Sequence, residues 1–121
     1  MKRRWIVIRD IIRKKLIDED YNFANIGTLY ILDAIEIICE SNEYLKLLEN
    51  LEKNVYVKIA QKYNKNEKTL KSDIIKATNK MNEIKFLKNM NNKTKIISFK
   101  KTPKMIISDI VDKIKNNCSC K

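Results

Sequence analysis

The chain has 121 residues, and its 26 lysines and arginines against 15 acidic residues give a formal net charge of +11. Hydrophobic residues make up 44% and charged residues 34%, a balance typical of a folded domain. One glycine and one proline predict an all-helical chain, and its length predicts a single domain over 1–121. One glycine excludes a glycine-rich phosphate loop, and the absence of histidine excludes Ser-His and Cys-His nucleophile pairs. We expect no enzyme, no catalytic residue, no metal site and no cofactor.

The basic charge is concentrated in one segment. Residues 1–52 carry 8 basic and 10 acidic groups, whereas residues 53–104 carry 15 lysines against three acidic residues, and residues 105–121 are nearly neutral. A concentrated positive field most often meets nucleic acid, because lysines that neutralise phosphates release condensed counterions. The alternative is a lysine-rich surface inherited from an AT-rich genome. Such a bias explains the total charge better than it explains the concentration of lysines in residues 53–104.

The three cysteines, Cys39, Cys118 and Cys120, form no disulfide framework, so we expect a cytoplasmic protein. Cys118 and Cys120 could recruit a soft metal, but a frayed tail with thiols is the simpler interpretation. No stretch approaches the roughly 20 apolar residues that a membrane span needs.

The first predicted helix carries an apolar stripe from Trp5 to Leu16. Its basic, amphipathic character fits either a packed domain helix or a helix on a membrane surface. We expect the acidic residues 18–20 that follow to form a solvated connection, because they lack the glycine and spacing of a calcium loop. From Gly27 the apolar positions return on several sides of a second helix, which we expect at the centre of the core.

Ser41 is expected to cap a third helix, whose apolar residues run from Tyr44 to Leu51. At the other end of the chain, Thr102 and Pro103 predict the start of a last helix, with threonine as cap and proline in the first turn. Between Asn82 and Lys101 the periodicity is lost. We interpret Asn89, Asn91 and Asn92 as turn residues and 93–99 as a short extended piece.

The clearest motif is a predicted helix-turn-helix at about 54–81. A short helix ends at Asn64, a residue that tolerates the left-handed conformation of a tight turn, and a second helix runs from Glu67 to Met81. Ala60 is small where the two helices would cross, and Leu70 lies at an inward position of the second helix. Six residues from the second helix and from the two motif helices should be buried together in one core: Leu32, Ile35, Ile59, Ala60, Leu70 and Ile74.

Three segments resemble the DNA-binding effector domain of the stage-zero sporulation response regulator of endospore-forming Firmicutes. They are residues 27–35, residues 55–64 and residues 107–115, and the resemblance extends over roughly 8–116. It implies an all-helical bundle of about six helices that binds short promoter boxes as a transcription regulator. Proteins of that family carry a receiver domain ahead of this module, and 121 residues leave no room for one, so we expect a stand-alone paralogue or a piece of a longer regulator.

The resemblance also assigns roles along the second motif helix. Where the family presents arginines and a histidine to the groove, this chain has Thr69, Ser72, Ile75 and Lys76, so bidentate reading of guanine by arginine is missing. Asp73 replaces a small apolar residue. Our candidates for base contacts are Thr69, Ser72 and Lys76, and our candidates for phosphate contacts are Lys65, Lys68, Lys71 and Lys80.

The leading hypothesis is a cytoplasmic regulator that binds double-stranded DNA with the helix 67–81 in the major groove. The alternative is a diverged interaction module that does not read DNA sequence. It would form a homo-oligomer or pair with a related regulator through its aliphatic last helix.

Overall fold

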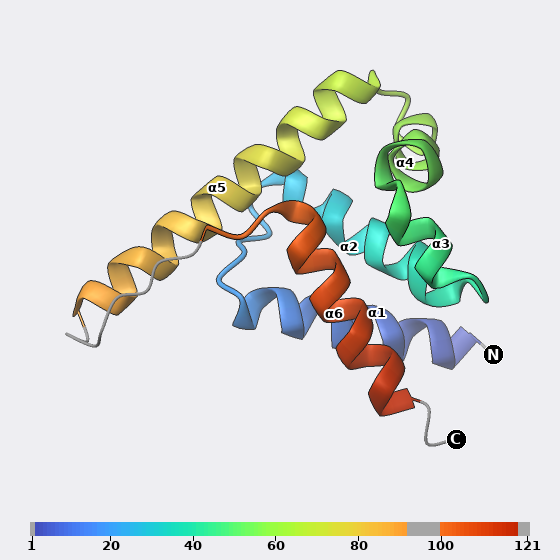
Figure 1. The fold of residues 1–121 in the computed structure, drawn as a ribbon, viewed down its shortest axis with the longest axis horizontal. Coiled ribbons are helices and arrows are strands. Elements are labelled where there is room, and N and C mark those ends of the chain that lie inside the picture. The colour runs from blue at the N-terminus through green and yellow to red at the C-terminus, as the bar shows by residue number, and fades with distance from the viewer. Residues whose placement is uncertain (1, 92–99, 119–121) are drawn as a thin grey trace.

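The structure is a computed structural model that describes residues 2–91 and 100–118. Of residues 2–7, 89, 91, 117 and 118 it describes the backbone alone. Every regular element in the described ranges is helical, as expected for an all-α fold. Residues 2–91 and 100–118 form six α-helices and one π-helical segment (Figure 1): α1 Lys2–Asp18, α2 Ile26–Glu40, α3 Tyr44–Glu49, η1 Glu52–Tyr56, α4 Val57–Lys62, α5 Glu67–Asn91 and α6 Pro103–Cys118.

Helix α2 is the centre of the fold, as its apolar pattern predicts. It contacts every other helix, with α5, α6 and α1 around it and α3, η1 and α4 beside its C-terminal half (Figure 1). Its buried residues include Tyr30, Ile31, Leu32, Ile35 and Ile38. All six residues of the predicted core are buried, which confirms that the helix periodicity was assigned correctly.

Helices α2 and α5 cross at a point where only glycine fits. A Cβ atom added to Gly27 would lie 2.0 Å from the main-chain oxygen of Asp73 and 2.9 Å from the Cβ of Ala77. The obstruction is backbone, so rotation of a side chain cannot relieve it. The single glycine of the chain is therefore needed for a close helix approach, and not for a turn.

The prediction that residues 18–20 form a solvated connection is wrong. Asp18 ends α1, and the acidic turn, which we define as Glu19 and Asp20, is bound by lysines from distant parts of the chain. Lys85 Nζ lies 3.1 Å from Glu19 Oε1 and 3.6 Å from Asp20 Oδ2. Lys88 also pairs with Asp20, and Lys101 Nζ lies 3.4 Å from Glu19 Oε1.

Helix α5 does not end at Met81 as predicted but continues to Asn91. Beyond Met81 no residue up to Lys88 is buried, and Lys85 and Lys88 pair with the acidic turn instead. The turns predicted at Asn89 and Asn91 are therefore wrong, whereas Asn92 and the extended piece at 93–99 lie outside the described residues.

The start of α6 is held by two polar contacts. Thr102 Oγ1 accepts a hydrogen bond from the main-chain N–H of Met105 (3.2 Å), which confirms threonine as the cap. The side chain of Asn82 in α5 binds the main chain of Lys101 twice, donating to its carbonyl (2.9 Å) and accepting from its N–H (3.0 Å). Asn82 thus ties the segment before α6 to the middle of α5.

Ser41 does not cap α3 in the predicted way. It follows the last residue of α2, and its hydroxyl accepts a hydrogen bond from the main-chain N–H of Glu43 (3.0 Å), one residue before α3 begins.

The apolar residues of α6 are buried in the core of this chain: Ile106, Ile107, Ile110, Val111 and Ile114. The apolar face that suggested α6 as a pairing surface is therefore already covered.

Candidate nucleic-acid interface

Helix α4 ends in a turn whose geometry depends on Asn64. Asn64 has φ 54°, the left-handed conformation that its position in the sequence predicts. The N–H of Lys65 donates to the carbonyl of Ala60 (2.8 Å), and the N–H of Asn64 donates to the carbonyl of Gln61 (3.2 Å). These two bonds form a Schellman motif, which stops α4 and turns the chain toward α5.

Helix α5 starts at a cap that the sequence analysis did not identify. The side-chain oxygen of Asn66 accepts a hydrogen bond from the N–H of Lys68 (2.8 Å), and the carbonyl of Asn66 accepts from Leu70 (3.0 Å). Asparagine just before a helix is a recognised capping signal, so the sequence did contain the clue. Two helices joined by a turn of four residues thus stand at the predicted place, and we call α4, the turn 63–66 and the N-terminal half of α5 the helix pair.

A buried carboxylate anchors the end of α4. Asp33 of α2 is 2% exposed and accepts a hydrogen bond from the hydroxyl of Tyr63, while Arg9 of α1 lies 3.1 Å from its other oxygen. Burial and the hydrogen bond to Asp33 raise the pKa of Tyr63 to about 12. Asp33 therefore connects α1 and α2 to the residue from which the turn begins.

All seven candidate contact residues are exposed, and they lie on the turn or on the outer side of α5. Their inward neighbours Leu70, Ile74 and Ala77 are buried, so the predicted face of the helix is correct. Thr69, Ser72 and Lys76 recur at a spacing of three and four residues and form one stripe. The structure brings this stripe together on one helix, with Lys65 and Lys68 at its N-terminal end and Lys80 at its C-terminal end.

The four predicted phosphate contacts differ in their partners. Lys71 Nζ lies 2.5 Å from Glu52 Oε2 of η1, and Lys80 Nζ lies 3.6 Å from Glu83 Oε1. Within the described part of the chain, Lys65, Lys68 and Lys76 form no ion pair. Both observed pairs are well exposed and therefore weak, so a phosphate can compete for these lysines as well.

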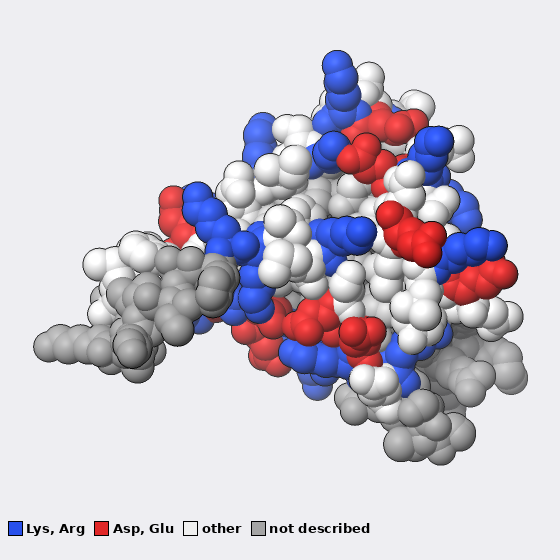
Figure 2. Space-filling view, in the orientation of Figure 1, with Lys and Arg blue, Asp and Glu red and all other residues white. Residues whose placement is uncertain are grey.

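Folding spreads the charge of the basic segment more evenly than its sequence indicates. Lys62, Lys85, Lys88 and Lys101 all meet carboxylates from residues 1–52. Figure 2 shows the result on one face of the molecule, where basic and acidic side chains are interspersed. The concentration of unpaired lysines on the helix pair is thus much smaller than the surplus of the segment as a whole.

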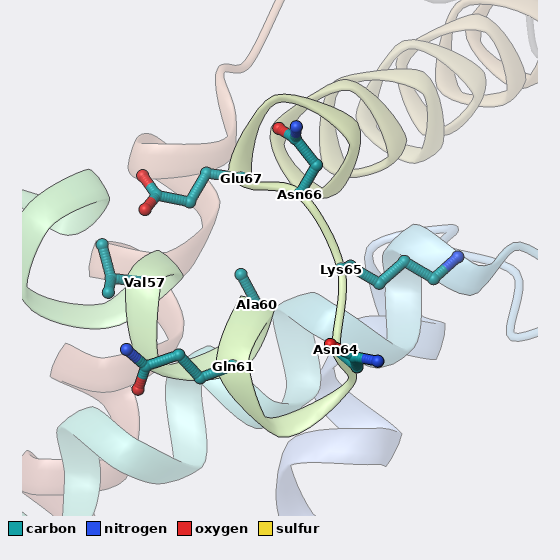
Figure 3. A pocket seen from close by; sticks show the side chains of 7 residues that line it. All are labelled: Val57, Ala60, Gln61, Asn64, Lys65, Asn66 and Glu67. Carbon is teal, nitrogen blue, oxygen red and sulfur yellow. The ribbon is translucent and has the colours of Figure 1, made fainter.

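The helix pair encloses an open depression of about 410 Å³ (Figure 3). Val57, Ala60 and Gln61 line it from α4, and Asn64, Lys65, Asn66 and Glu67 line it from the turn and the start of α5. Its side chains offer mixed donors and acceptors, with one carboxylate. This is the surface of a polar interface between two helices, and it lacks the apolar walls of a small-molecule pocket.

Other kinds of site are not seen in the ranges that the structure describes. There, no three His, Cys, Asp or Glu side chains converge in a way that could hold a metal ion, and no helix is long and apolar enough to cross a membrane. Cys118 and Cys120, the metal ligands considered in the sequence, lie beyond the described side chains.

Comparison of the chain with protein-family models, with curated protein sequences and with solved structures finds no match.

Proposed function

We propose that this protein binds duplex DNA through the helix pair, with the N-terminal half of α5 in the major groove, and that it acts in the cytoplasm as a transcription regulator. An α-helix fits the major groove of B-DNA, and the N-terminal part of a recognition helix is the part that meets base edges. The resemblance to the sporulation regulator's effector domain supports the same assignment.

One observation carries this proposal. The outer side of α5 between Glu67 and Met81 is exposed along its length, and Lys68 and Lys76 on it, with Lys65 in the turn before it, have no carboxylate partners among the described residues. Elsewhere on the same helix, Lys85 and Lys88 are neutralised by the acidic turn. Lysines that remain unpaired on one exposed helix face are available to phosphates.

A salt titration of DNA binding tests the proposal. We expect wild-type protein to bind mixed duplex fragments with an affinity that falls steeply with salt. Lys68→Ala should weaken binding to all sequences alike and lower the slope of log affinity against log salt by about one. Lys14→Ala is the matched control, because it removes an exposed lysine from α1, away from the helix pair. Folded wild-type protein that binds no duplex at low salt would refute the proposal.

Lys76 provides the corresponding test of base reading. A lysine on the outer stripe can donate to guanine O6 and N7, although without the fork of an arginine. Lys76→Ala should remove the preference at one base position, at a cost of about 1 to 3 kcal/mol for the preferred base. Equal weakening of every sequence by Lys76→Ala and Lys68→Ala would show that Lys76 contacts phosphate instead.

The interaction-module hypothesis receives less support from the structure. It rested on the aliphatic residues of α6, and these are buried against α2 and the rest of the core. A homo-oligomer or a pairing with a related regulator would therefore have to use a surface other than the apolar face of α6.

A further inference from the structure

An isoleucine stands on the outer side of the helix pair. The chain has two adjacent isoleucines in α5, of which Ile74 is fully buried and Ile75 is 39% exposed. Between Glu67 and Met81, Ile75 is the exposed large apolar residue, and the residues one turn away from it along α5 are all polar: Lys71, Ser72, Thr78 and Asn79. Ile75 is therefore a partly exposed apolar side chain with polar residues one turn before and after it.

Only one feature of the DNA major groove suits such a side chain. Base edges there present hydrogen-bond donors and acceptors, to which isoleucine can contribute nothing, and the exception is the C5-methyl group of thymine. Phosphates offer it nothing either. Lysines lie close to Ile75 on the same half of α5, with Lys68 two turns before it, Lys71 one turn before it and Lys76 next to it, so charges that can meet phosphates surround the isoleucine.

We propose that Ile75 selects thymine at one position of the DNA site by packing against its methyl group. This inference rests on the proposed function and deepens it, because it names a base and the chemical group that is read. A methyl group removed from water contributes roughly the value of one buried CH₂, which corresponds to about a fourfold change in affinity.

Replacing thymine with uracil is the direct test, since it removes the methyl group and leaves every hydrogen-bonding atom in place. A preferred duplex is first selected with wild-type protein, and each thymine in it is then replaced singly by deoxyuridine. We expect one replacement to lower affinity about fourfold, measured by fluorescence anisotropy at constant salt. Ile75→Ala should bind the thymine and uracil duplexes equally, because the contact partner is gone.

Leu87→Ala is the matched control variant. Leu87 is 53% exposed on the same helix, but it lies beyond the N-terminal half, and its loss should leave the wild-type response to uracil unchanged. Both variants replace an exposed side chain with alanine, a strong helix former, so circular dichroism should show folded protein in each case.

The possible failures are distinguishable. If the wild type binds no duplex, the proposed function fails and this inference fails with it. If the wild type binds but its selected site contains no thymine, or no uracil replacement weakens it, the inference alone is refuted. It is likewise refuted if Ile75→Ala keeps the fourfold response.

Discussion

The two halves of α5 carry similar numbers of lysines and use them differently. In the N-terminal half, Lys68 and Lys76 are exposed and form no ion pair among the described residues, and Lys71 pairs with the exposed Glu52. In the C-terminal half, Lys85 and Lys88 bind the acidic turn, and Asn82 holds the segment before α6. One half therefore keeps an exposed outer face, and the other half fastens the helix to the rest of the fold.

This difference shows that charge counted along a sequence is not charge on a surface. Residues 53–104 hold a large excess of lysine, yet the carboxylates that neutralise part of it come from residues 1–52. In the N-terminal half of α5, Lys71 meets the exposed carboxylate of Glu52, whereas lysines of the C-terminal half meet the more buried acidic turn. The inner side of the N-terminal half also differs, because it packs against α2 at a close backbone approach at Gly27.

The largest effect is expected from Gly27→Ala, which breaks the support of the N-terminal half. The added Cβ would overlap the main chain of Asp73, so α2 and α5 must move apart at a cost of about 3 kcal/mol. Denaturant unfolding followed by circular dichroism measures this loss. The double variant Gly27→Ala with Ala77→Gly should not recover the stability, because the carbonyl of Asp73 still obstructs the Cβ. An unchanged unfolding midpoint for Gly27→Ala would show that the two helices do not approach as closely.

Ala60→Leu tests the contact between α4 and α5. Ala60 is 3% exposed, and the larger side chain should separate the helix pair at a cost of about 1 to 3 kcal/mol. Gln61→Leu is a suitable control, because the neighbouring position is exposed and should tolerate the same side chain. A thermal midpoint that stays the same in Ala60→Leu would mean that the crossing of α4 and α5 has been misplaced.

Substitution of one lysine in each half tests the comparison itself. Lys85→Ala should lower the free energy of unfolding by up to about 1 kcal/mol, since it leaves the half-buried Glu19 with one partner fewer. Lys68→Ala should leave stability unchanged and weaken DNA binding. Unfolding and salt titration on both variants give the two readouts. Loss of DNA binding in Lys85→Ala equal to that in Lys68→Ala would contradict the division of labour within α5.

The smallest effect is a pH dependence carried by Glu19. Burial alone would raise the pKa of Glu19, but the hydrogen bonds and charges of Lys85 and Lys101 outweigh burial and hold its pKa below the ordinary 4.5. A carboxylate whose pKa is lowered by folding stabilises the protein above pH 4.5 and loses this contribution as the pH falls through the folded value. Glu19→Gln should therefore be less stable than wild type at pH 6, and the difference should shrink toward pH 3. A difference independent of pH would show that the ion pairs at the acidic turn contribute no stability.

The helices and the inward faces could be predicted because they depend on local spacing. The 3.6-residue period identified α1, α2 and α6 and the inward side of α5. Asn64 ends α4 and Thr102 caps the start of α6, as the chemistry of their side chains indicates. The exposure of the candidate face followed from the same spacing, since residues opposite Leu70 and Ile74 must be exposed once these two are buried, whereas the roles given to Thr69, Ser72 and Lys76 come from the resemblance.

Only the tertiary structure decided which charges remain available and why Gly27 is required. The pairing of Glu19 with Lys85 spans 66 positions in the sequence, and no periodicity encodes which lysine a distant carboxylate meets. The continuation of α5 to Asn91 has the same origin, because polar partners from the acidic turn support a stretch without an apolar stripe. Gly27 is required because the backbone of α5 passes within contact distance of α2, which depends on how two helices cross and not on the residues beside the glycine. Local spacing determines faces, whereas partners across the fold depend on where the chain brings them together.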